Sequence, residues 1–122
     1  LGRSVLWQEA IGDEQVPNMT TRTLVRAVGG SHLEPIYEQV QGIPSSLGPL
    51  EGPAYVQYDP ELPLPAEVNR PGVPSGAHSR SRTWLGSRLQ VAHFLDWESP
   101  GEVLHFCGDE VCAESNQGDP GS

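Results

Sequence analysis

Hydrophobic and polar positions alternate most clearly in the segment 84–106, which reads WLGSRLQVAHFLDWESPGEVLHF. It is the longest apolar-rich passage of the chain. Every second residue from Leu89 to Trp97 is apolar, with His93 as the one exception. A period of two that includes valine and tryptophan is typical of a strand with one buried face. The pattern therefore predicts a β-strand over 88–96.

The tetrapeptide Glu-Ser-Pro-Gly at 98–101 follows this strand and has the composition of a turn, because proline fixes one φ angle and glycine accepts positive values. The alternation then resumes over 102–107. Together these segments predict a β-hairpin. A helix over 84–95 is the alternative, since apolar residues also recur there at helical spacing.

Three earlier segments are predicted to be strands, at 4–11, 20–28 and 54–58. The second reads TTRTLVRAV and has apolar side chains on both parities, which is typical of a strand covered on both faces. Between the last two, 35–41 is predicted to be a short helix because a proline opens it and Gly42 follows it. An irregular loop is the alternative for so short a segment.

The remaining chain has the composition of loops. Five prolines fall within 59–79, which predicts an extended flap that could cover a binding site. The polar residues 115–122 are expected to be a disordered tail. The rest, 1–114, is expected to form a single domain, since 122 residues suffice for one modest core.

Charge and composition exclude several classes of partner. The formal net charge is −9, which argues against nucleic acid or an anionic membrane surface as the main partner. The chain has no apolar run near the roughly 20 residues that a membrane span needs. Its two cysteines are too few for a disulfide framework, so we expect a reducing, cytoplasmic location.

Four residues near the C-terminus are of the types that bind zinc: His93, His105, Cys107 and Cys112. Structural zinc sites usually contain cysteine pairs about two to four residues apart together with a second pair of ligands. This chain has one pair with wider spacing. The spacing therefore favours two unpaired thiols near the surface over a zinc site, and a disulfide would require an oxidising environment.

Two segments resemble the βαβββ module of the vicinal oxygen chelate superfamily, which includes glyoxalases, bleomycin-resistance proteins and extradiol dioxygenases. GSHLEPIYEQVQGIP, directly after TLVRAV, resembles the strand–helix opening of that module. LGSRLQVAHFLDWESPGEVLHF, with its G-x-R, aromatic residues and Asp-containing turn, resembles the closing hairpin. The resemblance implies an α+β fold: a βαβββ half-barrel module with a preceding strand and a long Pro-rich loop.

Family members usually pair two such modules in one chain, so this resemblance implies a homodimer or a partner module. It also implies a small-molecule ligand held in an aromatic-lined cleft at that junction. The expected ligand-binding residues are Tyr58, Trp84, Arg88, His93 and His105.

The family's enzymes hold a divalent metal with histidine and glutamate, but Thr23 stands where a histidine ligand would fall. No metal or other cofactor is therefore expected, and if a metal were bound, His105 and Glu9 would be its ligands. The expected function is a non-metal small-molecule binding protein. The alternatives are a metal-dependent glyoxalase-like or dioxygenase-like enzyme that uses His105, and an acidic protein-interaction module unrelated to the family.

Overall fold

A computed structural model describes residues 4–62 and 75–117 of the chain. The predicted mixture of helices and strands is confirmed. The strands are β1 (Leu6–Ala10), β2 (Ser31–Leu33), β3 (Ser45–Ser46), β4 (Leu50–Glu51), β5 (Ala54–Asp59), β6 (Glu102–Val103) and β7 (Cys112–Ala113). The helices are α1 (Asn18–Val28), α2 (Ala77–Arg80), the 3₁₀ turn η1 (Ser81–Thr83), α3 (Leu85–Phe94) and α4 (Glu114–Gln117).

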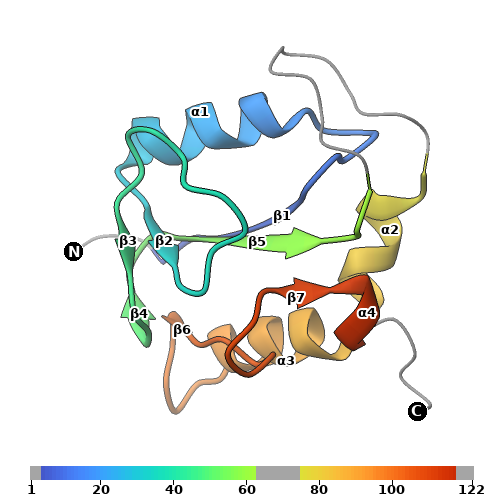
Figure 1. Ribbon diagram of the computed structural model, residues 1–122. Coiled ribbons are helices and arrows are strands. Elements are labelled where there is room, and N and C mark those ends of the chain that lie inside the picture. Colours follow the sequence, from blue (N-terminus) through green and yellow to red (C-terminus); the bar gives the residue numbers. More distant parts are fainter. Residues whose placement is uncertain (1–3, 63–74, 118–122) are drawn as a thin grey trace.

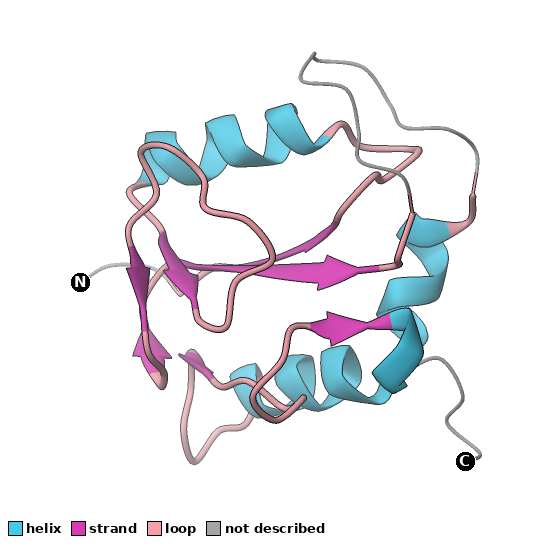
Figure 2. Ribbon diagram, viewed as in Figure 1, coloured by secondary structure: helices cyan, strands magenta, loops and turns pink. Residues whose placement is uncertain are grey.

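The strand β5 lies at the centre of a parallel sheet. It pairs with β1 along one edge, and with both β2 and β7 along the other, while β3 extends the sheet beyond β2. The helices α1 and α3 lie on opposite sides of this sheet (Figure 1). A separate antiparallel pair is formed by β4 and β6, and Figure 2 shows it at the border of the parallel sheet.

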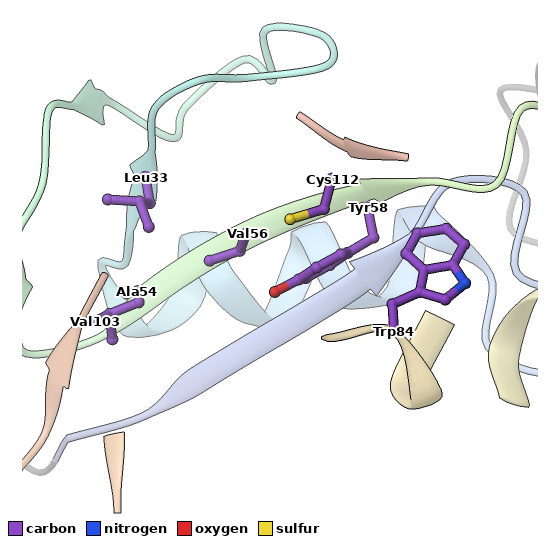
Figure 3. Packing of buried hydrophobic residues seen from close by; sticks show 7 residues of the cluster. All are labelled: Leu33, Ala54, Val56, Tyr58, Trp84, Val103 and Cys112. Atoms are coloured by element: carbon purple, nitrogen blue, oxygen red, sulfur yellow. The ribbon is translucent and has the colours of Figure 1, made fainter. Parts of the chain in front are cut away.

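Both faces of β5 are buried, and its side chains alternate between two cores. Tyr55 packs with Val25 of α1 in the smaller core. The larger core lies on the other face, where Figure 3 shows its side chains gathered along β5. Its buried members are Leu33, Ala54, Val56, Tyr58, Trp84, Val103 and Cys112. The alternation of β5 therefore joins the two helical layers through one strand.

The predicted strand at 20–28 is wrong, because this segment forms the helix α1. Only one apolar side chain faces the sheet fully, that of Val25, whereas Leu24 and Val28 are each 53% exposed. Gly29 ends the helix with φ at 80° and donates its N–H to the carbonyl of Val25. The β-branched residues suggested a strand, but intrinsic propensity is weaker than the packing of one helical face.

The predicted strand at 88–96 is also wrong, and the helical alternative is correct, since α3 spans Leu85–Phe94. Gly86, Ser87 and Gln90 are its buried residues. Leu89 and Val91, which shaped the alternating pattern, are exposed. The period of two therefore reflected the solvent-facing side chains, while small and polar residues form the face that packs.

The turn at 98–101 is confirmed, with Gly101 at φ 78° donating its N–H to the carbonyl of Phe94. The strand that follows is limited to β6, and it pairs with β4 instead of with 88–96. The predicted hairpin does not form. The half-barrel arrangement is therefore not confirmed, and the observed element order differs from βαβββ.

The segment 35–41 is a loop, so the predicted helix is wrong and the loop alternative is correct. Its backbone donors find a partner outside the segment, since the amide oxygen of Gln57 accepts the N–H groups of Tyr37 at 2.8 Å and Glu38 at 2.9 Å. A segment this short gains little from its own helical hydrogen bonds. The side chain of the neighbouring strand satisfies the backbone instead.

The strands predicted at 4–11 and 54–58 are confirmed as β1 and β5. Most of the predicted flap and tail, at 63–74 and 118–122, lies outside the described residues. The described ends of these segments include α2 and α4. Among the helices that the structure describes, none combines the length and apolarity needed to cross a membrane.

Val56 provides a test of the larger core because its side chain is 2% exposed. We expect Val56→Ala to lower the free energy of unfolding by about 2 kcal/mol, since it removes two buried carbons and leaves a cavity. Leu47→Ala is the control: Leu47 is 77% exposed, and its loss should change stability by less than about 0.5 kcal/mol. Urea denaturation followed by circular dichroism measures both, and equal effects would contradict this packing.

Candidate functional site

A buried polar network connects the sheet to α1. The Oε1 atom of Glu9 accepts hydrogen bonds from the Tyr55 hydroxyl at 2.5 Å and from Arg22 Nη2 at 3.1 Å. Arg22 also reaches Glu38 at 2.6 Å, which lies in the loop at 35–41. Gln57 donates to the Tyr55 hydroxyl at 3.2 Å. One carboxylate thus ties two strands, a helix and a loop together.

Burial dominates the electrostatics of this network. Burial raises the pKa of Glu9 to about 7, although the Arg22 guanidinium acts in the opposite direction. Burial and the charge of Arg22 lower the pKa of His32 to about 4, so this imidazole is neutral near pH 7. His32 packs against Tyr55 with ring centroids 4.6 Å apart. The network is covered by α1 and the loop, which indicates a structural role.

A second polar group lies where β1 and β5 end. Asp13, in the loop after β1, places Oδ2 at 2.7 Å from Nδ1 of His78 in α2. Its other oxygen, Oδ1, accepts the backbone N–H groups of Gln15 and Val16 at 2.7 and 2.9 Å. Both oxygens of the Asp13 carboxylate are therefore hydrogen-bonded within the protein, which fixes the orientation of the side chain.

This arrangement defines the hydrogen-bonding state of His78. A carboxylate oxygen only accepts hydrogen bonds, so Nδ1 of His78 carries the hydrogen. In the neutral ring the lone pair lies on Nε2, which can then accept a proton or a hydrogen bond. The neighbouring Glu14 accepts the backbone N–H of His78 at 3.1 Å, which joins the loop to α2 a second time.

The pair borders a cavity of about 50 Å³. Its walls are formed by Gln8, Ala10, Asp13, Tyr58, His78, Ser81, Arg82 and Ser87. The Tyr58 hydroxyl donates to Gln90 at 2.6 Å, and Gln8 also bonds to Gln90 at 2.9 Å, which fixes the polar wall. A water molecule takes up about 30 Å³ in the liquid. The cavity can therefore enclose a group of a few heavy atoms, and not a whole drug-sized molecule.

A third group lies near the C-terminus. Cys107 and Cys112 form a disulfide with their Cα atoms 5.3 Å apart, so the prediction of unpaired thiols is wrong. The loop turns back through Gly108 at φ 72°, which brings the two cysteines together. His105 lies beside them and bonds through Nε2 to the carbonyl of Glu110 at 2.7 Å.

The predicted ligand-binding residues do not share one cleft. Tyr58 lines the cavity beside Asp13 and is 6.3 Å from the Trp84 ring between centroids, but Trp84 is buried in the core. His93, in the last turn of α3, bonds to Glu102 of β6. His105 borders a different cavity, and Arg88 is exposed on α3.

The metal pair suggested by the family resemblance is not assembled. Among the described residues, the one cluster of three metal-ligating side chains consists of His105, Cys107 and Cys112. Glu9 is not part of it. Its Oε1 instead bonds to Arg22 and Tyr55 beneath α1. Glu9 and His105 therefore belong to two different groups of polar side chains.

No sequence pattern pointed to Asp13 or His78 as site residues. One signal was nevertheless available for Asp13, because Gly12 and Asp13 follow the predicted strand at 4–11. Ligands of parallel sheets commonly bind outside the carboxyl ends of the strands. His78 lies near the end of the Pro-rich segment, and no pattern links it to Asp13 across 65 positions.

Comparison with protein-family models, with curated proteins and with solved structures gives no match. The resemblance to the vicinal oxygen chelate superfamily stays a prediction at the level of the family. The two segments that suggested it adopt structures other than those it implies.

The raised pKa of Glu9 makes stability depend on pH. Between pH 4.5, the ordinary value, and about 7, the folded chain retains the Glu9 proton while the unfolded chain has lost it. The free energy of unfolding should therefore fall as pH rises through this window, by about 3 kcal/mol at most. Glu9→Gln should remove that part of the slope.

Glu98→Gln is the matched control, because Glu98 is exposed in the turn after α3. Urea denaturation at several pH values between 4.5 and 7 measures the slope of each variant. An unchanged slope in Glu9→Gln would contradict a buried, protonated Glu9.

Proposed function

We propose that this chain binds a small polar molecule that carries an acidic group, in the cavity beside Asp13 and His78. The observation that carries the proposal is the Asp13–His78 pair, held at 2.7 Å at the carboxyl ends of two parallel strands. Open parallel sheets commonly bind ligands outside the carboxyl ends of their strands.

Arg82 supplies the positive charge for the acidic group. Its side chain borders the same cavity as His78, and a guanidinium can bind a carboxylate or phosphate through two parallel hydrogen bonds. The cavity of about 50 Å³ suits such a group. The rest of the ligand would extend outward, over the exposed side of α2 and η1.

His78 would select a ligand that has a hydroxyl group beside its acidic group. Because Nδ1 is held by Asp13, the free lone pair of Nε2 can accept a hydrogen bond from a ligand hydroxyl. The same nitrogen can exchange a proton with the ligand, which is the chemistry of a general base. The site is thus suited to proton transfer as well as to binding.

Small-molecule binding was also predicted from the sequence, but at a different place. The sequence predicted an aromatic-lined cleft at a junction, whereas the site proposed here lies at the carboxyl end of the sheet. Of the predicted ligand-binding residues, Tyr58 alone lines it. Membership in the glyoxalase-type family, the acidic interaction module and the cytoplasmic location stay predictions.

The site is tested by NMR titration of the labelled chain with inorganic phosphate and with glycolate. Saturable shifts should appear at the amides of Ala10, Asp13 and Ser81. We expect His78→Gln and Arg82→Gln to weaken binding of the responding probe at least about tenfold, the value of one charge-assisted hydrogen bond.

Arg88→Gln is the matched control, because it removes an arginine of the same charge from the exposed side of α3. It should leave the affinity unchanged. Equal weakening by all arginine and histidine variants, or shifts spread evenly over the surface, would contradict the site.

Self-association is a separate proposal, carried over from the predicted homodimer. Leu85, Leu89, Leu95 and Trp97 are large apolar side chains on α3 or just after it, and all are exposed. Two-fold pairing of copies is a common way to cover such side chains. We propose that a second copy of this chain covers them.

Light scattering at micromolar concentration measures the mass. We expect a dimer for the native chain and a monomer for Leu95→Glu with Trp97→Gln. Leu24→Glu is the control, since Leu24 is also exposed but belongs to α1, which lies on the other side of the sheet from α3 (Figure 1). A native chain that is monomeric would contradict this proposal.

A further inference from the structure

The cluster of His105, Cys107 and Cys112 lies apart from the proposed ligand site and has no part in it. Its potential metal-ligating atoms all lie within 4.8 Å of one another. Four ligands at the distances typical of zinc are themselves separated by roughly 3.5–4 Å in a tetrahedral site. The three side chains therefore need only small shifts to surround one ion once the sulfur–sulfur bond is open.

The tautomer of His105 also suits a metal. The carbonyl of Glu110 can only accept, so the 2.7 Å hydrogen bond places the hydrogen on Nε2 of His105. In the neutral ring the lone pair is then on Nδ1. Metal-bound histidines usually donate their other ring N–H to a carbonyl or carboxylate, which orients the ring and strengthens the ligand. Here that second contact already exists.

The loop that carries the cysteines is held by contacts other than the disulfide. Cys112 belongs to β7, which pairs with β5 in the parallel sheet, and its side chain is buried in the larger core. Asn116 accepts the N–H of Ala113 at 2.9 Å and donates to the carbonyl of Val111 at 3.0 Å. Opening the disulfide therefore leaves Cys112 in place.

We propose that reduction of the Cys107–Cys112 disulfide creates a zinc site formed by both thiolates and the imidazole of His105. A dithiol reductant donates two electrons and two protons, the sulfur–sulfur bond breaks, and the reductant becomes a disulfide. Zinc then replaces the two thiol protons, which are released to solvent. The oxidised chain has no free thiolate and does not hold the ion there.

Three protein ligands leave the fourth position of a tetrahedral zinc ion open. His105 borders a cavity of about 520 Å³ together with Asp109, Gly108 and the segment 47–49. Water or a ligand donor atom could reach the ion from this cavity. The chain would thus exchange a covalent cross-link for an accessible metal centre according to the redox state.

The test uses the full chain, oxidised or reduced with a phosphine that does not bind zinc tightly, and titrated anaerobically with cobalt and then zinc. The reduced chain should bind one ion and show thiolate-to-cobalt charge-transfer absorption that zinc abolishes. The oxidised chain should show neither. His105→Ala should weaken binding at least about tenfold. Cys107→Ser should weaken binding equally and lower the charge-transfer absorption.

His93→Ala is the matched control, because His93 is also a half-buried histidine in this region but bonds to Glu102 and lies outside the cluster. It should bind as the native chain does. Three results would overturn the proposal: no binding by the reduced chain, equal affinity in His105→Ala, or loss of helical circular dichroism on reduction that zinc does not reverse.

Discussion

Burial of both faces of β5 is the constraint on which the rest of this structure depends. A strand with α1 on one side and α3 on the other has no solvent-facing positions at its centre, so each polar side chain on it needs a partner. Tyr55, Gln57 and Tyr58 are all fully buried, and each is hydrogen-bonded. Through these bonds, Tyr55 holds Glu9, Gln57 holds the loop at 35–41, and Tyr58 holds Gln90.

The same constraint separates a structural polar group from a candidate binding group. Glu9 lies within β1 and is buried beneath α1, and its bonds hold the layers together. Asp13 lies in the loop after β1 and His78 in the short helix α2, beyond the ends of β1 and β5. Position along the strand, more than residue type, therefore distinguishes the two carboxylates.

The sequence predicted β1, β5 and the turn at 98–101, because strong local patterns coincide there with the buried faces. It misassigned α1 and α3 because their packing faces contain few large apolar residues: Val25 in one, and Gly86, Ser87 and Gln90 in the other. Of the site, the sequence predicted Tyr58 alone. The meeting of Asp13 with His78 depends on tertiary structure that no local period encodes.

The three tryptophans occupy three different environments, which gives the molecule a built-in optical reporter. Trp84 is 3% exposed beside Tyr58, Trp7 is half-buried under α1, and Trp97 is 84% exposed after α3. Because Trp97 is already in contact with water in the folded chain, its emission maximum should be close to that of an unfolded chain. Any spectral shift on denaturation thus originates in Trp84 and Trp7, one from each core, and acrylamide can quench Trp97 selectively to reveal them.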